Sequence, residues 1–261
     1  MTPYRLLLAY VTAGFIAAPA YAQWSGSLGV GLRNFSFTEV DQQGGRLVRE
    51  RGVLPAVYGG AAFKSGRLRL TTTADIAGNS ITYDGRSQLG QPVTSTTNEY
   101  MTLIGAGAEF AIDDTWSVAA SAEHRRWRRA INGVGPLLGL QEHSKITQLV
   151  AGVIAQLPGT DIGTLSIGAK GVFASPERIR VNFSGALDAV SLRTRSASGI
   201  RLNVGYRPSQ SSPINIEAQY DRMHVARSDD VGVSRNGVPF GSVAQPAHTS
   251  ETFAVVLRYD F

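Results

Sequence analysis

Residues 249–261, TSETFAVVLRYDF, form the stretch of sequence that decides the fold, because large apolar and mostly polar side chains alternate along it. Successive side chains of a β-strand point to opposite faces, so every second residue shares a face. One face of this segment carries Phe253, Val255, Leu257, Tyr259 and Phe261. In water such a face needs a protein core to cover it, but in a bilayer it can meet lipid directly. The segment therefore predicts a strand of a transmembrane β-barrel.

The last three residues, Tyr259, Asp260 and Phe261, also carry a resemblance to a known class of protein. They resemble the terminal strand of bacterial outer-membrane β-barrels, in which an aromatic C-terminus is read by the insertion machinery. The resemblance implies that Tyr259 and Phe261 are an insertion signal and that the barrel insertion machinery is a partner. It also implies that the chain lies in the outer membrane of a Gram-negative cell.

The N-terminal segment has the features of a secretory signal peptide. Arg5 supplies a positive charge, residues 6–18 are apolar, and residues 19–22 (PAYA) offer small side chains to a signal peptidase. An uncleaved membrane anchor is the alternative, but the apolar stretch is shorter than the about 20 residues that a spanning helix needs. We therefore expect a signal peptide at 1–22, cleaved before Gln23, and one barrel domain at 23–261.

Alternation with a period of two recurs along the rest of the chain, and turn-forming residues separate the alternating segments. Short and long connections follow one another, as expected when short turns face the periplasm and long loops face outside. The short ones are expected near 64–66, 113–114, 158–161 and 207–213, and the long ones near 40–46, 84–98, 131–144, 176–188 and 228–246. The sequence predicts an all-β antiparallel transmembrane barrel of about ten strands, with eight or twelve as alternatives. The expected strands are 24–39, 47–63, 67–83, 98–112, 115–130, 145–157, 163–174, 189–206, 214–227 and 249–261. A soluble sandwich would also alternate, but its exposed faces are usually richer in Lys and Glu.

Aromatic residues fall at the strand ends beside the chain termini and the short turns. In the predicted topology they collect at one membrane interface and form an aromatic girdle. They are Trp24, Phe63, Phe110, Trp116, Tyr206, Tyr259 and Phe261.

Composition narrows the chemistry that this chain can perform. It contains no cysteine, so neither disulfides nor thiol chemistry are available. Its four histidines are scattered without the spacing of metal ligands, and we expect no metal site and no cofactor. The net charge is +5, and for an exported chain anionic lipid is a more natural partner than nucleic acid. Nothing in the sequence indicates an oligomeric state.

The densest charge cluster is HRRWRR at 124–129, near the predicted outer end of a strand. Guanidinium groups bind phosphate in bidentate fashion. One hypothesis is therefore a contact with lipopolysaccharide phosphates, and another is a basic constriction inside the barrel. The alternative is an ordinary solvated rim with no dedicated role. The residues concerned are Arg125, Arg126, Arg128 and Arg129.

A second set of charges points to the interior of the barrel. Three arginines are expected on one strand, and acidic and amide side chains share one face of the next strand. Opposite charges on neighbouring strands predict a salt-bridged ladder that leaves little open water path in a narrow lumen. The ladder residues are Arg193, Arg195, Arg201, Glu217 and Asp221, accompanied by Asn215 and Gln219.

Two enzymatic alternatives rest on histidines near the outer rim. A ten-stranded barrel is similar to the omptin proteases, which would place Asp221 and His224 at a catalytic rim, but a spacing of three puts them on opposite strand faces. His248 and Ser250 weakly resemble the His-x-Ser arrangement of outer-membrane lipid A deacylases, although the flanking residues do not match. The sequence favours a non-enzymatic, structural or surface-interacting barrel, with a narrow solute channel and an omptin-like rim hydrolase as alternatives.

Overall fold

The computed structural model describes residues 23–86, 90–135, 138–157, 163–209 and 211–261, so the expected signal peptide lies outside the described residues. Ten strands build a barrel wall. They are β1 (Gln23–Val40), β2 (Arg46–Ser65), β3 (Leu68–Arg86), β4 (Pro92–Ala111), β5 (Trp116–Ile131), β6 (Leu140–Leu157), β7 (Thr164–Ala174), β10 (Ala197–Arg207), β11 (Ile214–Val225) and β14 (Ala247–Asp260). Among the described residues, no helix is long and apolar enough to cross a membrane.

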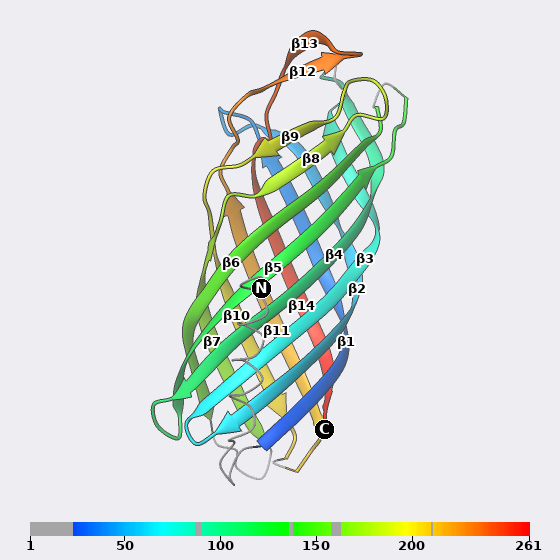
Figure 1. Ribbon diagram of the computed structural model, residues 1–261. Helices are drawn as coiled ribbons and strands as arrows, with labels where there is room; N and C mark the ends of the chain where they lie inside the picture. The colour runs from blue at the N-terminus through cyan, green and yellow to red at the C-terminus, as the bar shows by residue number, and fades with distance from the viewer. Residues whose placement is uncertain (1–22, 87–89, 136–137, 158–162, 210) are drawn as a thin grey trace, which may run out of the picture.

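Antiparallel pairing closes the wall into a barrel (Figure 1). The first strand pairs with the last, β1 with β14, and β5 with β6 completes the ring. Closure leaves no strand edge with unpaired amide groups, which is what a sheet needs in order to span a bilayer. The prediction of a ten-stranded antiparallel barrel is confirmed.

The outer surface carries the apolar belt that the alternation predicts. In β1, Leu28, Val30 and Leu32 point outward and are about 60% exposed, whereas Phe35 and Phe37 point inward and are buried. The same belt continues on β14, where Phe253, Val255, Leu257 and Tyr259 are each about half exposed. Large apolar side chains left uncovered on every side of a barrel are stable only against lipid.

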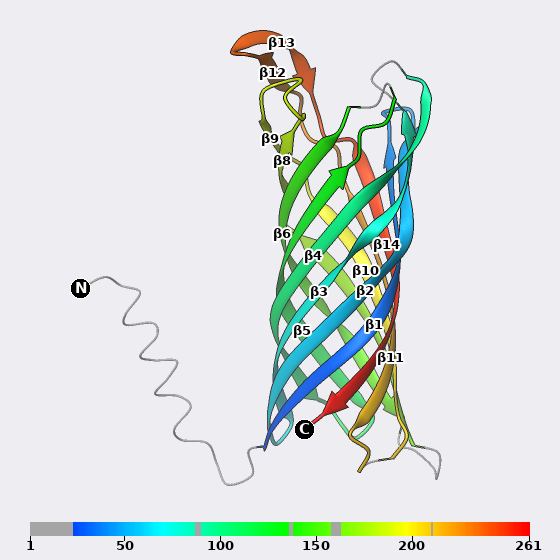
Figure 2. The same cartoon turned by 90° about the vertical axis from the view of Figure 1, so that its right-hand side faces the viewer.

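The strands of one side of the barrel are longer than a membrane requires. β1 to β6 contain 16 to 20 residues each, whereas a tilted strand crosses the hydrocarbon core with about 9–11 residues. Beyond Leu32, the outward positions of β1 become polar, with Asn34, Ser36 and Thr38. The barrel therefore extends past the membrane at the end away from the chain termini (Figure 2).

Connections at the two ends of the barrel differ, and this difference orients it. At one end of the barrel, where β1 begins and β14 ends, short turns join the strands. We call this the turn end. At the opposite end, two hairpins project: β8 (Arg178–Asn182) with β9 (Val190–Arg193), and β12 (Val231–Arg235) with β13 (Val238–Val243). We call this the hairpin end, and by the rule for bacterial barrels it faces outside.

The structure corrects three details of the sequence prediction. The single strand expected at 189–206 is two strands, because the chain leaves the β8–β9 hairpin after Arg193 and enters the wall only at Ala197. The long loop expected near 176–188 contains β8, and the one expected near 228–246 contains β12 and β13. The connection expected to be long at 40–46 is a tight turn, closed by a hydrogen bond from the amide of Asp41 to the carbonyl of Gly45.

Candidate functional site

An aromatic layer fills the barrel interior toward the hairpin end. Phe37 and Leu54 are fully buried and Trp127 is 5% exposed, because alternation turns all three away from lipid. The rings of Phe35 and Phe37 meet the Trp127 indole edge to face, with centroids 5.7 and 5.1 Å apart. Such pairs pack densely and add specific attraction to the burial of area. The layer therefore places three large side chains inside the barrel at this level.

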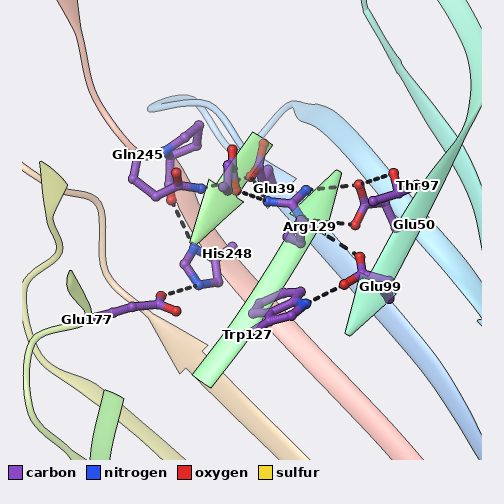
Figure 3. Close-up of polar contacts among 11 residues, drawn as sticks. Glu39, Glu50, Thr97, Glu99, Trp127, Arg129, Glu177, Gln245 and His248 are labelled. Carbon is purple, nitrogen blue, oxygen red and sulfur yellow. Dashed lines mark hydrogen bonds and ion pairs between the residues drawn. The ribbon is translucent and has the colours of Figure 1, made fainter. Parts of the chain in front are cut away.

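Beside this layer, one arginine is surrounded by four glutamates (Figure 3). The guanidinium of Arg129 donates to both carboxylate oxygens of Glu50, at 3.2 and 2.9 Å, and to Glu142 at 2.6 Å. Glu39 lies 3.4 Å and Glu99 3.9 Å from the same group. Arg129 is 3% exposed and also lies over the Phe37 ring, 4.2 Å from its centroid. We call these five residues the Arg129 network.

Uncharged side chains also donate hydrogen bonds to the glutamates of this network. Thr97 donates to Glu50 at 2.8 Å, the Trp127 indole donates to Glu99, and the Gln245 amide donates to Glu39 at 2.8 Å. Buried carboxylates are stable only where hydrogen bonds replace the lost water. The donors come from β4, β5 and the segment before β14, so the network ties distant parts of the wall together. We call the Arg129 network and the aromatic layer together the plug.

His248 and Glu177 form a buried pair on the rim of the plug. Nε2 of His248 lies 3.3 Å from Glu177, and Nδ1 lies 3.2 Å from the carbonyl oxygen of Pro246. Burial raises the pKa of Glu177, but the hydrogen bond and charge of His248 more than offset it and hold that pKa below its usual range. Because both ring nitrogens face acceptors, neither is directed at the hydroxyl of Ser250 as a base would be.

A cavity of about 350 Å³ lies in the barrel interior below the plug. Ion pairs line it: Arg33 lies 2.7 Å from Asp75, and Arg201 lies 2.7 Å from Glu123 and 2.5 Å from Asp221. Charges removed from bulk water must be paired in this way. The lining is therefore polar, but most of its charge is neutralised within the wall.

The predicted lumen ladder is assembled in part. Arg201, Asp221 and Glu217 point inward, and Glu217 pairs with Arg258 at 3.0 Å. Arg193 and Arg195 do not join them, which corrects the prediction. Arg193 lies on the exposed face of the β8–β9 hairpin, and Arg195 pairs with the exposed Asp229 outside the wall.

The arginines of 125–129 divide between the two faces of β5. Arg125 and Arg129 point inward, so neither can reach the outer lipid, and this corrects the prediction that all four contact lipopolysaccharide. Arg126 and Arg128 are exposed on the outer face. Trp127 points inward as well, which makes it part of the plug instead of an interface residue.

The histidine and acid considered for a rim hydrolase diverge. Asp221 faces the lumen and pairs with Arg201, whereas His224 is exposed on the outer face, where its Nδ1 lies 3.2 Å from the Thr249 hydroxyl. These two residues therefore cannot act on one substrate. In the described part of the chain, no group of three or more His, Asp or Glu side chains is arranged to hold a metal ion.

The aromatic girdle lies where the sequence predicts it, at the turn end and mostly exposed on the outer surface. Trp24 and Phe63 pack together on β1 and β2, with ring centroids 4.9 Å apart. Tyr259 and Phe261, the predicted insertion signal, are 55% and 69% exposed on the same surface. The backbone of Phe261 is fixed to Gly26 by two hydrogen bonds.

Comparison with known proteins supports the fold. No family model and no curated protein matches the sequence. Outer membrane protease OmpT from Escherichia coli superposes with a TM-score of 0.57 at 9% identity, over 94% of this chain and 98% of that chain. The translocator domain of autotransporter NalP from Neisseria meningitidis gives 0.48 at 13% identity, over 99% and 95% of the two chains. The β domain of the Bordetella autotransporter BrkA gives 0.46 at 13%, over 91% and 100%.

The likeness to OmpT establishes the fold alone, that of bacterial outer-membrane β-barrels. The apolar belt on the outer wall independently requires a lipid environment. The chain is an integral barrel of the outer membrane.

Proposed function

We propose that this chain is a closed, non-enzymatic barrel that anchors a platform at the cell surface and does not conduct solutes. The observation that carries the proposal is the plug. Its side chains are buried, and a cavity of about 10 Å³ lies among Phe37, Trp127, Arg129 and His248. That volume holds about one water molecule and no larger solute.

The parts of the barrel beyond the membrane support a role in surface contact. The β12–β13 hairpin stands above the wall, and the β8–β9 hairpin extends the sheet beside the upper part of β6 (Figure 2). Asp188 joins them, because its carboxylate accepts hydrogen bonds from the Ser234 hydroxyl at 2.6 Å and the Gly237 amide at 2.9 Å. Phe240 and Val238 remain 59% and 65% exposed on β13. Exposed apolar side chains on an ordered projection are typical of a contact surface.

A narrow channel is the second candidate, and the cavity below the plug is the observation that favours it. Its charged lining resembles the polar interior of conducting barrels. For this candidate to hold, the plug would have to open, which would break several buried hydrogen bonds of Arg129 at once.

Swelling of proteoliposomes in small neutral solutes separates the two candidates. We expect no swelling with the wild-type barrel, and measurable swelling when Phe37→Ala and Trp127→Ala are combined, because this removes two rings of the plug. Phe253→Ala, on the lipid-facing surface, is the matched control and should leave the vesicles tight. Wild-type swelling as fast as that of the double variant contradicts the proposed function.

A further inference from the structure

Basic side chains form a row across four neighbouring strands on the outer surface. Arg126 of β5 lies opposite Lys145 of β6, Lys145 opposite Arg178 of β8, and Arg178 opposite Arg193 of β9. All four side chains are exposed, because the positions between them along each strand point inward. A second row continues the first, with Arg128 opposite His143 and His143 opposite Arg180. We call these seven residues the basic patch.

The charges of the basic patch have no partners within the protein. Across the described residues, no ion pair or hydrogen bond joins any of the seven side chains to another group. Other exposed arginines are paired, for example Arg222 with Glu251 and Arg227 with Asp230. Neighbouring strands are about 4.7–4.9 Å apart, and like charges placed directly opposite destabilise a sheet. Anions from outside the protein would relieve the repulsion within such a row.

The basic patch lies directly above the apolar belt. On β6 the last large outward apolar residue is Leu149, and on β7 its neighbour is Phe173. Lys145 is four residues further along β6. This distance is about 13 Å along the strand and about 10 Å in height at the tilt of such barrels, which is the level of lipid headgroups.

The basic patch differs from the rest of the outer surface in how its cations are arranged. Elsewhere above the belt, β2 presents Arg49 and Arg51 beside the uncharged Thr38 and Ser36 of β1, and Arg222 of β11 pairs with Glu251. Among the described residues, cations face one another across four successive strands only on β5, β6, β8 and β9. This arrangement points to a ligand that carries several negative charges.

We propose that the basic patch binds the phosphate groups of a lipid of the outer leaflet, the lipopolysaccharide type with phosphorylated sugar headgroups. Guanidinium groups recognise phosphate oxygens in pairs, and two adjacent rows offer several such contacts to one headgroup. The apolar belt beneath receives the acyl chains of the same molecule. This site is on the outer wall, so it holds whether or not the lumen conducts.

The test is binding of purified lipopolysaccharide to the barrel in phosphatidylcholine bicelles. We compare Arg126→Gln, Lys145→Gln and Arg178→Gln in one variant with a control of equal charge change, Arg49→Gln, Arg51→Gln and Arg222→Gln. The patch variant should bind at least about ten-fold more weakly, while the control binds like the wild type. Lipopolysaccharide with its phosphates enzymatically removed should bind the wild type as weakly as the patch variant binds the intact lipid.

Three results would overturn the proposal. The first is equal affinity of the patch variant and the wild type, and the second is an equal loss in both triple variants, which would indicate unspecific attraction. The third is inhibition by inorganic pyrophosphate at the concentration of the lipid, which would make the ligand a free phosphate. Without lipopolysaccharide, the patch variant should be no less stable than the wild type, because like-charge repulsion is relieved. Lower stability there contradicts the premise of an unneutralised row.

Discussion

Replacing Arg129 by methionine tests the plug at its most connected side chain. Methionine keeps most of the length of the side chain but removes its charge and all its donors. In the variant, Glu50 loses two hydrogen bonds and Glu142 loses its hydrogen bond of 2.6 Å, so both carboxylates are left without a counter-charge. Glu39 and Glu99 lose the same cation. Buried carboxylates without a counter-charge are costly, and the barrel should become much less stable.

The expected magnitude follows from the burial of the network. Removing one partner of a buried ion pair costs about 3–5 kcal/mol, because the other charge is left in a poorly solvated place. Arg129 and Glu50 are 3% and 0% exposed, so solvent does not screen their interaction. A loss of about 3–5 kcal/mol lowers the folding equilibrium constant by about two to three and a half orders of magnitude.

Urea titration of the barrel refolded in phospholipid vesicles measures this loss. Tryptophan fluorescence reports it, since Trp127 lies within the plug. Arg126→Met is the matched control, because Arg126 is an exposed arginine on the same strand and should cost little. Adding Glu50→Gln to Arg129→Met should recover part of the loss, because it removes one stranded charge. A change below about 1 kcal/mol for Arg129→Met, or an equal change for Arg126→Met, refutes the reasoning.

Two further predictions concern the belt and the hairpins. In the same urea titration, Val255→Lys, in the middle of the apolar belt, should destabilise the barrel by about 2–4 kcal/mol. Thr249→Lys, beyond the belt, should destabilise it by at most about 1 kcal/mol. Equal losses for the two variants would contradict the assigned position of the belt. The hydrogen bond from Ser234 and those from the Gly237 and Asn236 amides lower the pKa of Asp188 from its ordinary 3.8. The stabilisation that ionised Asp188 gives to the hairpins is therefore fully present above its ordinary pKa of 3.8 and is lost as pH falls through its lower pKa in the folded protein. Hydrogen exchange at the Gly237 amide should therefore become faster in acid, by more than the intrinsic effect of pH on exchange. In Asp188→Asn the exchange should be faster already at neutral pH. An unchanged exchange rate in the variant would show that Asp188 does not hold the hairpin.

The alternation of residues 249–261 and of similar segments was enough to predict the architecture, because period-two patterns, turn chemistry and closure rules act locally. The hairpin-side ends of β3, β4 and β6 were predicted too short. Beyond the membrane both faces become polar, as at Gln141 and Glu142 of β6, so the pattern fades before the strand ends. The short strand β8 was hidden for the same reason within a segment that read as a loop, and β9 was merged into the single strand expected at 189–206.

The plug was missed because its members are far apart in the sequence. Glu39, Glu50, Glu99 and Glu142 lie on four strands, and only the curvature of the closed barrel brings them to Arg129. One signal was present: each acid lies at an inward position near the hairpin end of its strand. Alternation along 124–129 sends some of these side chains inward and others outward, but it does not identify the partners of the inward ones. Sequence spacing gives the face of a side chain, but the partner across the lumen depends on strand tilt and stagger.

Single-channel recording in planar bilayers tests the closed barrel most directly. Refolded wild-type protein, with insertion verified independently, should give a silent membrane at both polarities, because the buried rings and ion pairs of the plug lie across the lumen. Stable unitary current steps from the wild-type barrel would contradict the account, since ions would then be crossing the layer that Phe37, Trp127 and Arg129 are held to close.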